Sequence, residues 1–255
     1  MVFAEFYQSY KLKNMTIYDD EKIQEVLNDF AIESFRKTAD QDYIAARMSY
    51  KAGLVEPFLW SALHAIEKYL KAILLFNSVS AKKGGHDIEE LLCRVKKIKN
   101  VDLGLPKNVE NFIKYLNQYG ENRYFEGCAL LEQYALDNLD ETIWYIRRCC
   151  HYDSYPHLPK IPPAQQVQNP KRCDMSGFLE EVIKKELPAY PYLIWNNWFY
   201  GKEGQGLDRE TIRNTQTKCS ESHSCLDFWG QQYFEILNKY VCFSANTKTY
   251  YKLKD

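Results

Sequence analysis

EPFLWSALHAIEKYLKAILLF, residues 56–76, is the most regular amphipathic stretch of the chain. Its large aliphatic side chains recur every three or four residues, which places them along one face of an α-helix. Glu67 and Lys71 lie four residues apart on the remaining surface, in the order that favours an ion pair. The pattern therefore predicts one long helix with a continuous apolar face. That face consists of Leu59, Leu63, Ile66, Leu70, Ile73 and Leu74.

Weaker helical patterns lie on both sides of this stretch. Residues 19–30, 38–51, 86–95, 109–119 and 127–150 each repeat apolar side chains at helical spacing. Glycines follow two of these segments, at Gly53 and Gly120, and glycine is a common residue just after a helix end. Consecutive helices joined by short turns predict a mainly α fold, a helical bundle over residues 1–152.

The chain changes character after this bundle. Five prolines between residues 153 and 175 exclude a regular helix there and predict an extended linker. Residues 176–255 are rich in aromatic side chains and less regular. Residues 178–187 and 226–240 have helical patterns, whereas 240–253 alternates like a strand. We therefore predict a smaller, mixed accessory region at the C-terminal end.

Composition limits the classes of partner. The 255 residues carry a formal net charge of −1, so any attraction to nucleic acid must come from a local patch. We find neither the apolar core of a signal peptide nor a run of about 20 apolar residues that could cross a bilayer. We expect a cytoplasmic protein with no membrane contact, whose eight cysteines are reduced thiols.

Three short segments, taken in order, resemble the HEPN domain family. AIEKYLKA, residues 65–72, is similar to the family's central-helix pattern A-x-E-x-x-L-K-A. HDIEELL, residues 86–92, is similar to the H-[DN]-L-x-x-L start of its next helix, and NRY, residues 122–124, resembles the turn before its last helix. The resemblance covers roughly residues 35–151. It implies an up-and-down bundle that pairs as a homodimer.

The resemblance also implies two kinds of function. Many family members are metal-independent ribonucleases of toxin–antitoxin pairs, phage defence or RNA processing. Others are non-catalytic binding modules that accompany a nucleotidyltransferase. This chain has neither a nucleotidyltransferase signature nor a phosphate-binding loop. Such an enzyme would therefore be a separate protein partner.

Ribonuclease members carry an arginine and a histidine that are separated by four to six residues, near the start of the last helix. The imidazole moves protons and the guanidinium holds the scissile phosphate. Arg123 occupies the arginine position, but residues 124–130 contain no histidine. Arg147 and His151 would share one helix face, but only three residues separate them, one fewer than in the family pattern. They also lie at the end of the predicted last helix, where basic residues complement the helix dipole. Arg123, Arg147 and His151 are the catalytic candidates.

Binding candidates lie mostly on the matched motifs. The resemblance gives the Glu67 and Lys71 side chains a structural or groove-lining role, although a solvated face with one ion pair is a simpler interpretation. His86 either caps its helix or packs beside the central one. The candidate binding residues are Arg47, Glu67, Lys68, Lys71, His86 and Tyr124.

Two further groups of residues could form sites. Basic residues concentrate at 82–83 and 94–107, where they could attract phosphates if the fold gathers them on one face. An ordinary solvated face is the alternative. Cys219, His223 and Cys225 could offer zinc ligands, but their spacing matches no common finger pattern. We predict no metal and no cofactor.

The sequence as a whole favours a homodimeric HEPN module that binds RNA, a nucleotide or a partner protein and lacks the nuclease signature. The resemblance suggests a defence or toxin–antitoxin setting. Two alternatives stay open. One is a metal-independent endoribonuclease with a divergent Arg/His site, and the other is a structural scaffold whose C-terminal region holds a protein partner.

Overall fold

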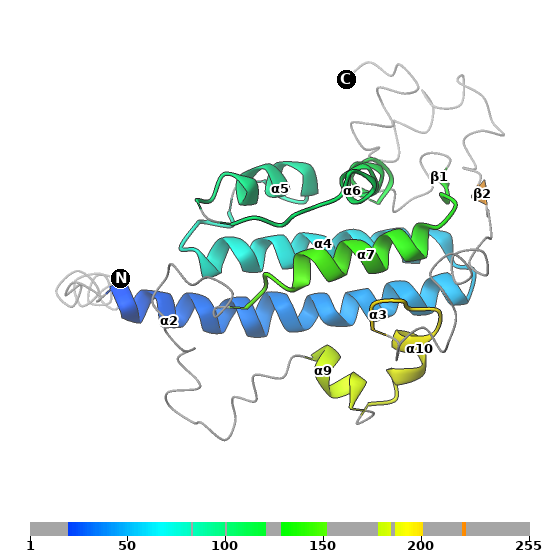
Figure 1. Cartoon of the computed structure of the whole chain (residues 1–255), viewed down its shortest axis with the longest axis horizontal. Helices are drawn as coiled ribbons and strands as arrows, with labels where there is room; N and C mark the ends of the chain where they lie inside the picture. The colour runs from blue at the N-terminus through cyan, green and yellow to red at the C-terminus, as the bar shows by residue number, and fades with distance from the viewer. Residues whose placement is uncertain are drawn as a thin grey trace, which may run out of the picture.

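The computed structural model describes residues 20–82, 84–99, 101–120, 129–151, 178–184, 187–200 and 221–222. Within these residues helices dominate, and the predicted mainly α fold is confirmed. Figure 1 shows them packed side by side around the helix that contains residues 56–76. The helices are α2 (Asp20–Phe30), η1 (Ala31–Arg36), α3 (Lys37–Lys51), α4 (Val55–Phe76), α5 (Ile88–Lys96), α6 (Lys107–Tyr119), α7 (Ala135–Arg147), α9 (Phe178–Ile183) and α10 (Tyr190–Ile194).

Helices α2, η1 and α3 form one continuous rod (Figure 1). The residues that flank the π-helical segment η1, Phe30 and Lys37, both keep right-handed helical backbone angles, so the chain passes through without a break. The α2 end of the rod leaves three large apolar side chains exposed, at Ile23, Val26 and Phe30. The helical pattern of residues 19–30 is therefore real, but much of its apolar stripe faces outward.

Helix α4 is the centre of the bundle. All six residues of its predicted apolar face are buried. It packs against α3 on one side and against α5 and α7 on others. Figure 1 shows α4 and α7 between the α2–α3 rod and the pair α5 and α6. The predicted amphipathic helix is confirmed, and its burial extends well beyond one face.

The turn between α3 and α4 follows from one glycine. Gly53 has a φ of +77°, which a residue with a side chain rarely adopts. The amide of Gly53 donates to the carbonyl of Tyr50, and that of Leu54 donates to Ser49, which is the Schellman pattern. The predicted helix end at Gly53 is confirmed, and the chain reverses there to start α4.

The last helix of the bundle starts later than the sequence predicted. We expected a helix over 127–150, but α7 begins at Ala135. Tyr134 has a left-handed backbone with a φ of 67°. Before it, β1 (Ala129–Leu130) pairs antiparallel with β2 (Glu221–Ser222). This pairing takes residues that have a helical pattern and places them in extended backbone.

Part of the predicted accessory region belongs to the core of the bundle. Helices α9 and α10 pack against α3, and their side chains Leu179, Val182 and Leu193 are buried in the same cluster as α4. The predicted helix 178–187 is shorter, ending at Ile183. The division of the chain at residues 152 and 176 stays a prediction. The predicted linker 153–175 and the elements at 226–253 lie outside the described residues.

The described helices and cysteines bear on membrane contact and on thiol chemistry. None of its helices is both long and apolar enough to cross a membrane. Among the described cysteines, Cys93, Cys149 and Cys150 are free thiols. Cys150 is buried in the core and burial raises the pKa of its thiol well above the usual value.

Candidate functional site

Four polar side chains meet where α5 begins beside α4. We call His64, Glu67, Lys71 and His86 the α4 polar cluster. The Glu67 carboxylate lies at its centre with a side chain only 5% exposed. Its Oε1 accepts a hydrogen bond from the Lys71 ammonium. Its Oε2 lies 3.0 Å from Nδ1 of His86 and 3.5 Å from Nδ1 of His64.

Local sequence explains how the cluster forms. Residues 64, 67 and 71 fall on one side of α4 because their spacing follows the helical repeat. His86 arrives from the turn before α5, where Gly84 and Gly85 take φ angles of +107° and +54°. The Asp87 side chain then accepts a hydrogen bond from the Glu90 amide and caps α5. Asp87 is thus the cap, and His86 packs beside the central helix, one of its two predicted roles.

The cluster holds charged groups in a partly buried place. Desolvation pushes the pKa of Glu67 upward, but hydrogen bonds from Lys71 and His86 outweigh it, and the pKa lies below its usual value. Desolvation lowers the pKa of His64, against the opposing charge of Glu67. An ionised carboxylate and a neutral imidazole therefore coexist there at neutral pH.

Lys68 faces a different neighbour. Its Nζ lies 2.6 Å from Oδ2 of Asp42 on α3, with both side chains 28% exposed. This pair adjoins the α4 polar cluster, because the charge of Asp42 also acts on His64. Of the predicted binding residues, Glu67, Lys68, Lys71 and His86 are therefore brought together.

Arg47, another predicted binding residue, lies in the core. Its side chain is 0% exposed and forms a buried ion pair with Asp140 of α7, which is 1% exposed. Its remaining donors bind the carbonyl oxygens of Tyr192 and Trp195 around α10. All of its polar atoms are thus directed at the protein itself, so this geometry gives Arg47 a structural role and no route to a ligand.

Arg147, of the predicted pair Arg147 and His151, is held by a carboxylate in the core. Arg147 donates from Nε to Oδ1 of Asp40 at 2.8 Å and from Nη2 to Oδ2 at 3.0 Å. Its side chain is 9% exposed, and Asp40 is fully buried. His151 follows α7 and is partly buried. The geometry therefore uses the Arg147 guanidinium to hold α7 on α3, and Arg123 and Tyr124 lie outside the described residues.

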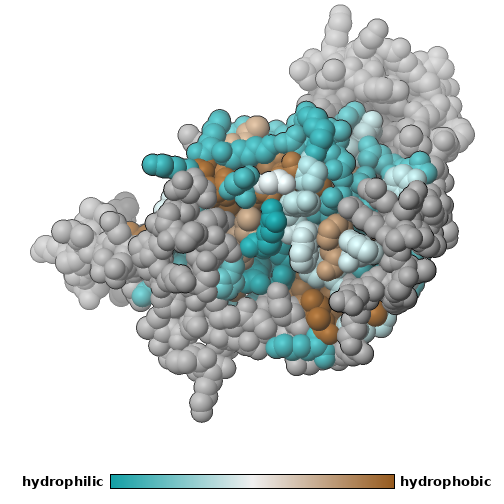
Figure 2. Space-filling view, viewed as in Figure 1, coloured by the Kyte–Doolittle hydropathy of each residue, from teal (hydrophilic) through white to brown (hydrophobic). Residues whose placement is uncertain are grey.

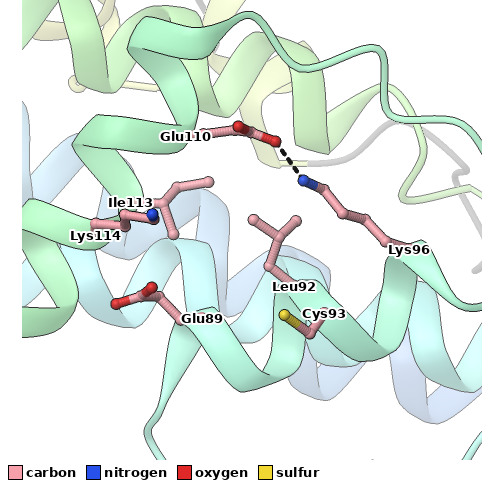
Figure 3. A pocket seen from close by; sticks show the side chains of 7 residues that line it. All are labelled: Glu89, Leu92, Cys93, Lys96, Glu110, Ile113 and Lys114. Carbon is pink, nitrogen blue, oxygen red and sulfur yellow. Dashed lines mark hydrogen bonds and ion pairs between the residues drawn. The ribbon is translucent and has the colours of Figure 1, made fainter.

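A second site lies between α5 and α6. The pocket there has a volume of about 200 Å³. Figure 3 shows Leu92 and Ile113 facing one another across it. Lys96 and Glu110 form an ion pair at its rim, and Lys107 lies 3.4 Å from the other oxygen of Glu110. We call this the α5–α6 pocket. Its lining residues are Glu89, Leu92, Cys93, Lys96, Glu110, Ile113 and Lys114.

Sequence reasoning found only part of this pocket. The basic segment 94–107 pointed to Lys96 and Lys107, whereas Lys114 and both carboxylates were missed. The helical periods of α5 and α6 could have placed Leu92 and Ile113 on apolar faces. The facing of those two helices depends on the irregular segment 97–106, whose path no periodicity predicts. Figure 2 shows hydrophilic side chains along the edge where α5 and α6 lie.

One comparison with known proteins matches part of the chain. Residues 32–136 match the family model described as the HEPN domain. This interval runs from η1 through α3, α4, α5 and α6 into the first residues of α7. It includes both the α4 polar cluster and the α5–α6 pocket. No curated protein and no solved structure matches the chain.

Proposed function

Because this chain carries a HEPN domain over residues 32–136, we propose that it is a HEPN binding module that holds single-stranded RNA without cleaving it. The observation that carries the proposal is the α5–α6 pocket, where an apolar floor lies among lysines that come from two helices. Lys96 and Lys114 line the pocket, and Lys107 reaches its rim through Glu110. Two residues of the predicted basic segment, Lys96 and Lys107, thus lie at this opening.

The chemistry of the pocket suits a nucleotide unit. Ligand sites are typically apolar with a few polar groups that fix orientation. Leu92 and Ile113 can support the flat face of a base, and the carboxylates of Glu89 and Glu110 can accept hydrogen bonds from its exocyclic amino group. The neighbouring lysine ammonium groups would neutralise the flanking phosphates and release counterions.

Two observations support binding without cleavage. Residues 124–130 lack the histidine that the ribonuclease signature requires after Arg123. The displaced candidate Arg147 has its guanidinium bound to Asp40 in the core. A cleavage site would need a cation that is free to hold the scissile phosphate in the transition state. The divergent-nuclease hypothesis therefore has the weaker support.

The homodimer and the biological setting are proposals from the family. We infer that two copies associate, and exposed apolar side chains at Ile23, Val26 and Phe30 of α2 provide surface of the kind that interfaces bury. A defence or toxin–antitoxin setting, and a separate nucleotidyltransferase partner, follow from the resemblance alone. Light scattering of the purified full chain measures its mass in solution and so tests the homodimer directly.

The test is the salt dependence of RNA binding. We expect the anisotropy of a labelled single-stranded RNA to report binding that weakens steeply as salt rises. Replacing Lys96 and Lys114 together by alanine should lower the slope of log affinity against log salt by about 1.4, at roughly 0.7 per lost phosphate contact. Lys37→Ala is the matched control, since that lysine pairs with Glu33 on η1, away from the pocket.

The same samples separate the alternatives. Equal affinity and slope for the double variant and the Lys37→Ala control would refute the pocket as the RNA site. Incubation of a mixed RNA pool in chelator tests the enzyme hypothesis. Cleavage by the wild type that disappears in Arg123→Ala or His151→Ala would establish the divergent endoribonuclease instead.

A further inference from the structure

The α4 polar cluster has donor atoms that the proposed RNA pocket does not use. His64, Glu67 and His86 each offer one ligand atom, and these atoms all lie within 4.8 Å of one another. Two come from adjacent turns of α4 and the third comes from the turn before α5. We propose that these three residues form a binding site for a divalent transition metal of the zinc class.

The spacing of the donors fits such an ion. Zinc bonds to histidine nitrogen and carboxylate oxygen are about 2.0–2.2 Å, so two ligands in a tetrahedron lie roughly 3.4 Å apart. The Nδ1 atoms of His86 and His64 lie 3.0 and 3.5 Å from the same Glu67 oxygen, on either side of that value. The remaining adjustment falls on His86, whose side chain is 57% exposed and stands on a glycine turn.

The two oxygens of Glu67 have separate partners. Lys71 binds Oε1, whereas both imidazoles face Oε2. Lys71 can therefore keep its ion pair and orient the carboxylate while Oε2 binds the metal, the arrangement that outer-shell partners give to metal ligands. The Trp60 ring packs edge-on against His64, with centroids 4.0 Å apart, and this contact restrains the imidazole.

The second nitrogen of the His64 ring does not compete with the proposed metal. Nε2 of His64 is buried and has no hydrogen-bond partner among the described residues, so no competing acceptor fixes this ring away from Glu67.

The donor set selects the class of ion and its coordination. Two imidazoles with one carboxylate favour zinc, cobalt or nickel over magnesium and calcium, which prefer oxygen ligands. Three protein ligands leave at least one position for water or an anionic oxygen, as in open zinc sites. Because the neighbouring charges pair as Lys71 with Glu67 and Lys68 with Asp42, the bound ion would keep its positive charge.

The experiment measures metal binding to the chelator-stripped full chain with zinc, by competition against a chelating dye, and with cobalt, by its visible absorption. We expect His86→Ala to lose one equivalent that the wild type and His151→Ala retain. Loss of a ligand should weaken that site by more than the roughly 10–100-fold typical of outer-shell changes. The cobalt spectrum of this equivalent should lack thiolate charge transfer, which separates it from binding at the eight cysteines.

One outcome overturns the proposal: the same number and affinity of bound ions in wild type and His86→Ala. The cluster would then be a hydrogen-bonded network of Glu67 with its neighbours. Glu67→Gln is the second variant, which should also lose the equivalent. His86→Ala decides the matter even where Glu67→Gln fails to fold, because His86 is exposed and outside the core. The result is independent of RNA binding, which the α5–α6 pocket would retain.

Discussion

Arg47→Met should lower the free energy of unfolding far more than substitution of a surface lysine does. Methionine keeps much of the side-chain volume but removes the charge that pairs with Asp140 inside the core. Asp140 would then accept a hydrogen bond only from the hydroxyl of Tyr43 among the described residues, at 2.6 Å. Removing one partner of a buried ion pair costs about 3–5 kcal/mol, because the other charge stays desolvated and unpaired.

The stability cost of Arg47→Met has two parts, the lost ion pair with Asp140 and the lost hydrogen bonds around α10. Arg47 also donates to the carbonyl oxygens of Tyr192 and Trp195, so the variant loses the attachment of α10 to α3 as well. Asp140→Leu should cost a similar amount alone, since it leaves the Arg47 charge buried. The double variant should cost much less than the sum of the two, because a well-packed apolar pair replaces a buried ion pair at little cost.

Thermal unfolding followed by circular dichroism measures these free energies. For a chain of this size, 1 kcal/mol shifts the melting temperature by about 2–4 °C, so each single variant should melt roughly 6–20 °C lower. Tryptophan fluorescence should change as well, since Trp195 loses its contact with Arg47. A cost below about 1 kcal/mol for Arg47→Met would refute the argument. Loss of RNA binding with an unchanged melting temperature would restore Arg47 as a ligand-binding residue.

Two further predictions concern the junction of α4 and α5. Asp87→Ala should cost about 1 kcal/mol in thermal unfolding, because the Glu90 amide loses its capping acceptor; an unchanged melting temperature would show that the cap is replaceable by water. Glu67 has a pKa below its unfolded value of about 4.3, so its contribution to stability is present above that pH and is lost as the pH falls through the folded pKa. Glu67→Gln should therefore flatten the fall in melting temperature below pH 5, and an equally steep fall in both proteins would contradict this assignment.

The fold could be predicted where the spacing of apolar residues alone determines which side chains are buried. Residues 56–76 carry so regular an apolar face that α4 follows from them, and Gly53 marks the end of α3 because only a left-handed residue closes that turn. Prediction failed at the start of α7. There the pairing of Ala129–Leu130 with Glu221–Ser222, more than 90 residues away, overrides the helical pattern of residues 129–134.

The buried charges could not be predicted for a related reason. Arg47 and Asp140 are 93 residues apart, and each is a residue type that is common on the exposed surface of a helix. Only the packing of α3 against α7 shows that they neutralise each other. The same holds for Asp40 and Arg147, 107 residues apart. Sequence patterns give the faces of helices, whereas the pairing of two polar residues across a core depends on the arrangement of all helices.

The α4 polar cluster shows why the two family-like motifs belong together physically. Glu67 of the first motif and His86 of the second are 19 residues apart and meet at 3.0 Å. One contact therefore fixes the turn between α4 and α5 and also assembles the donors of the proposed metal site. A stabilising role and a binding role predict the same residues at these positions, so neither the motifs nor their spacing can distinguish them. They differ in what His86→Ala removes: a structural contact costs melting temperature with or without zinc, whereas a ligand costs the increase in melting temperature that zinc itself produces.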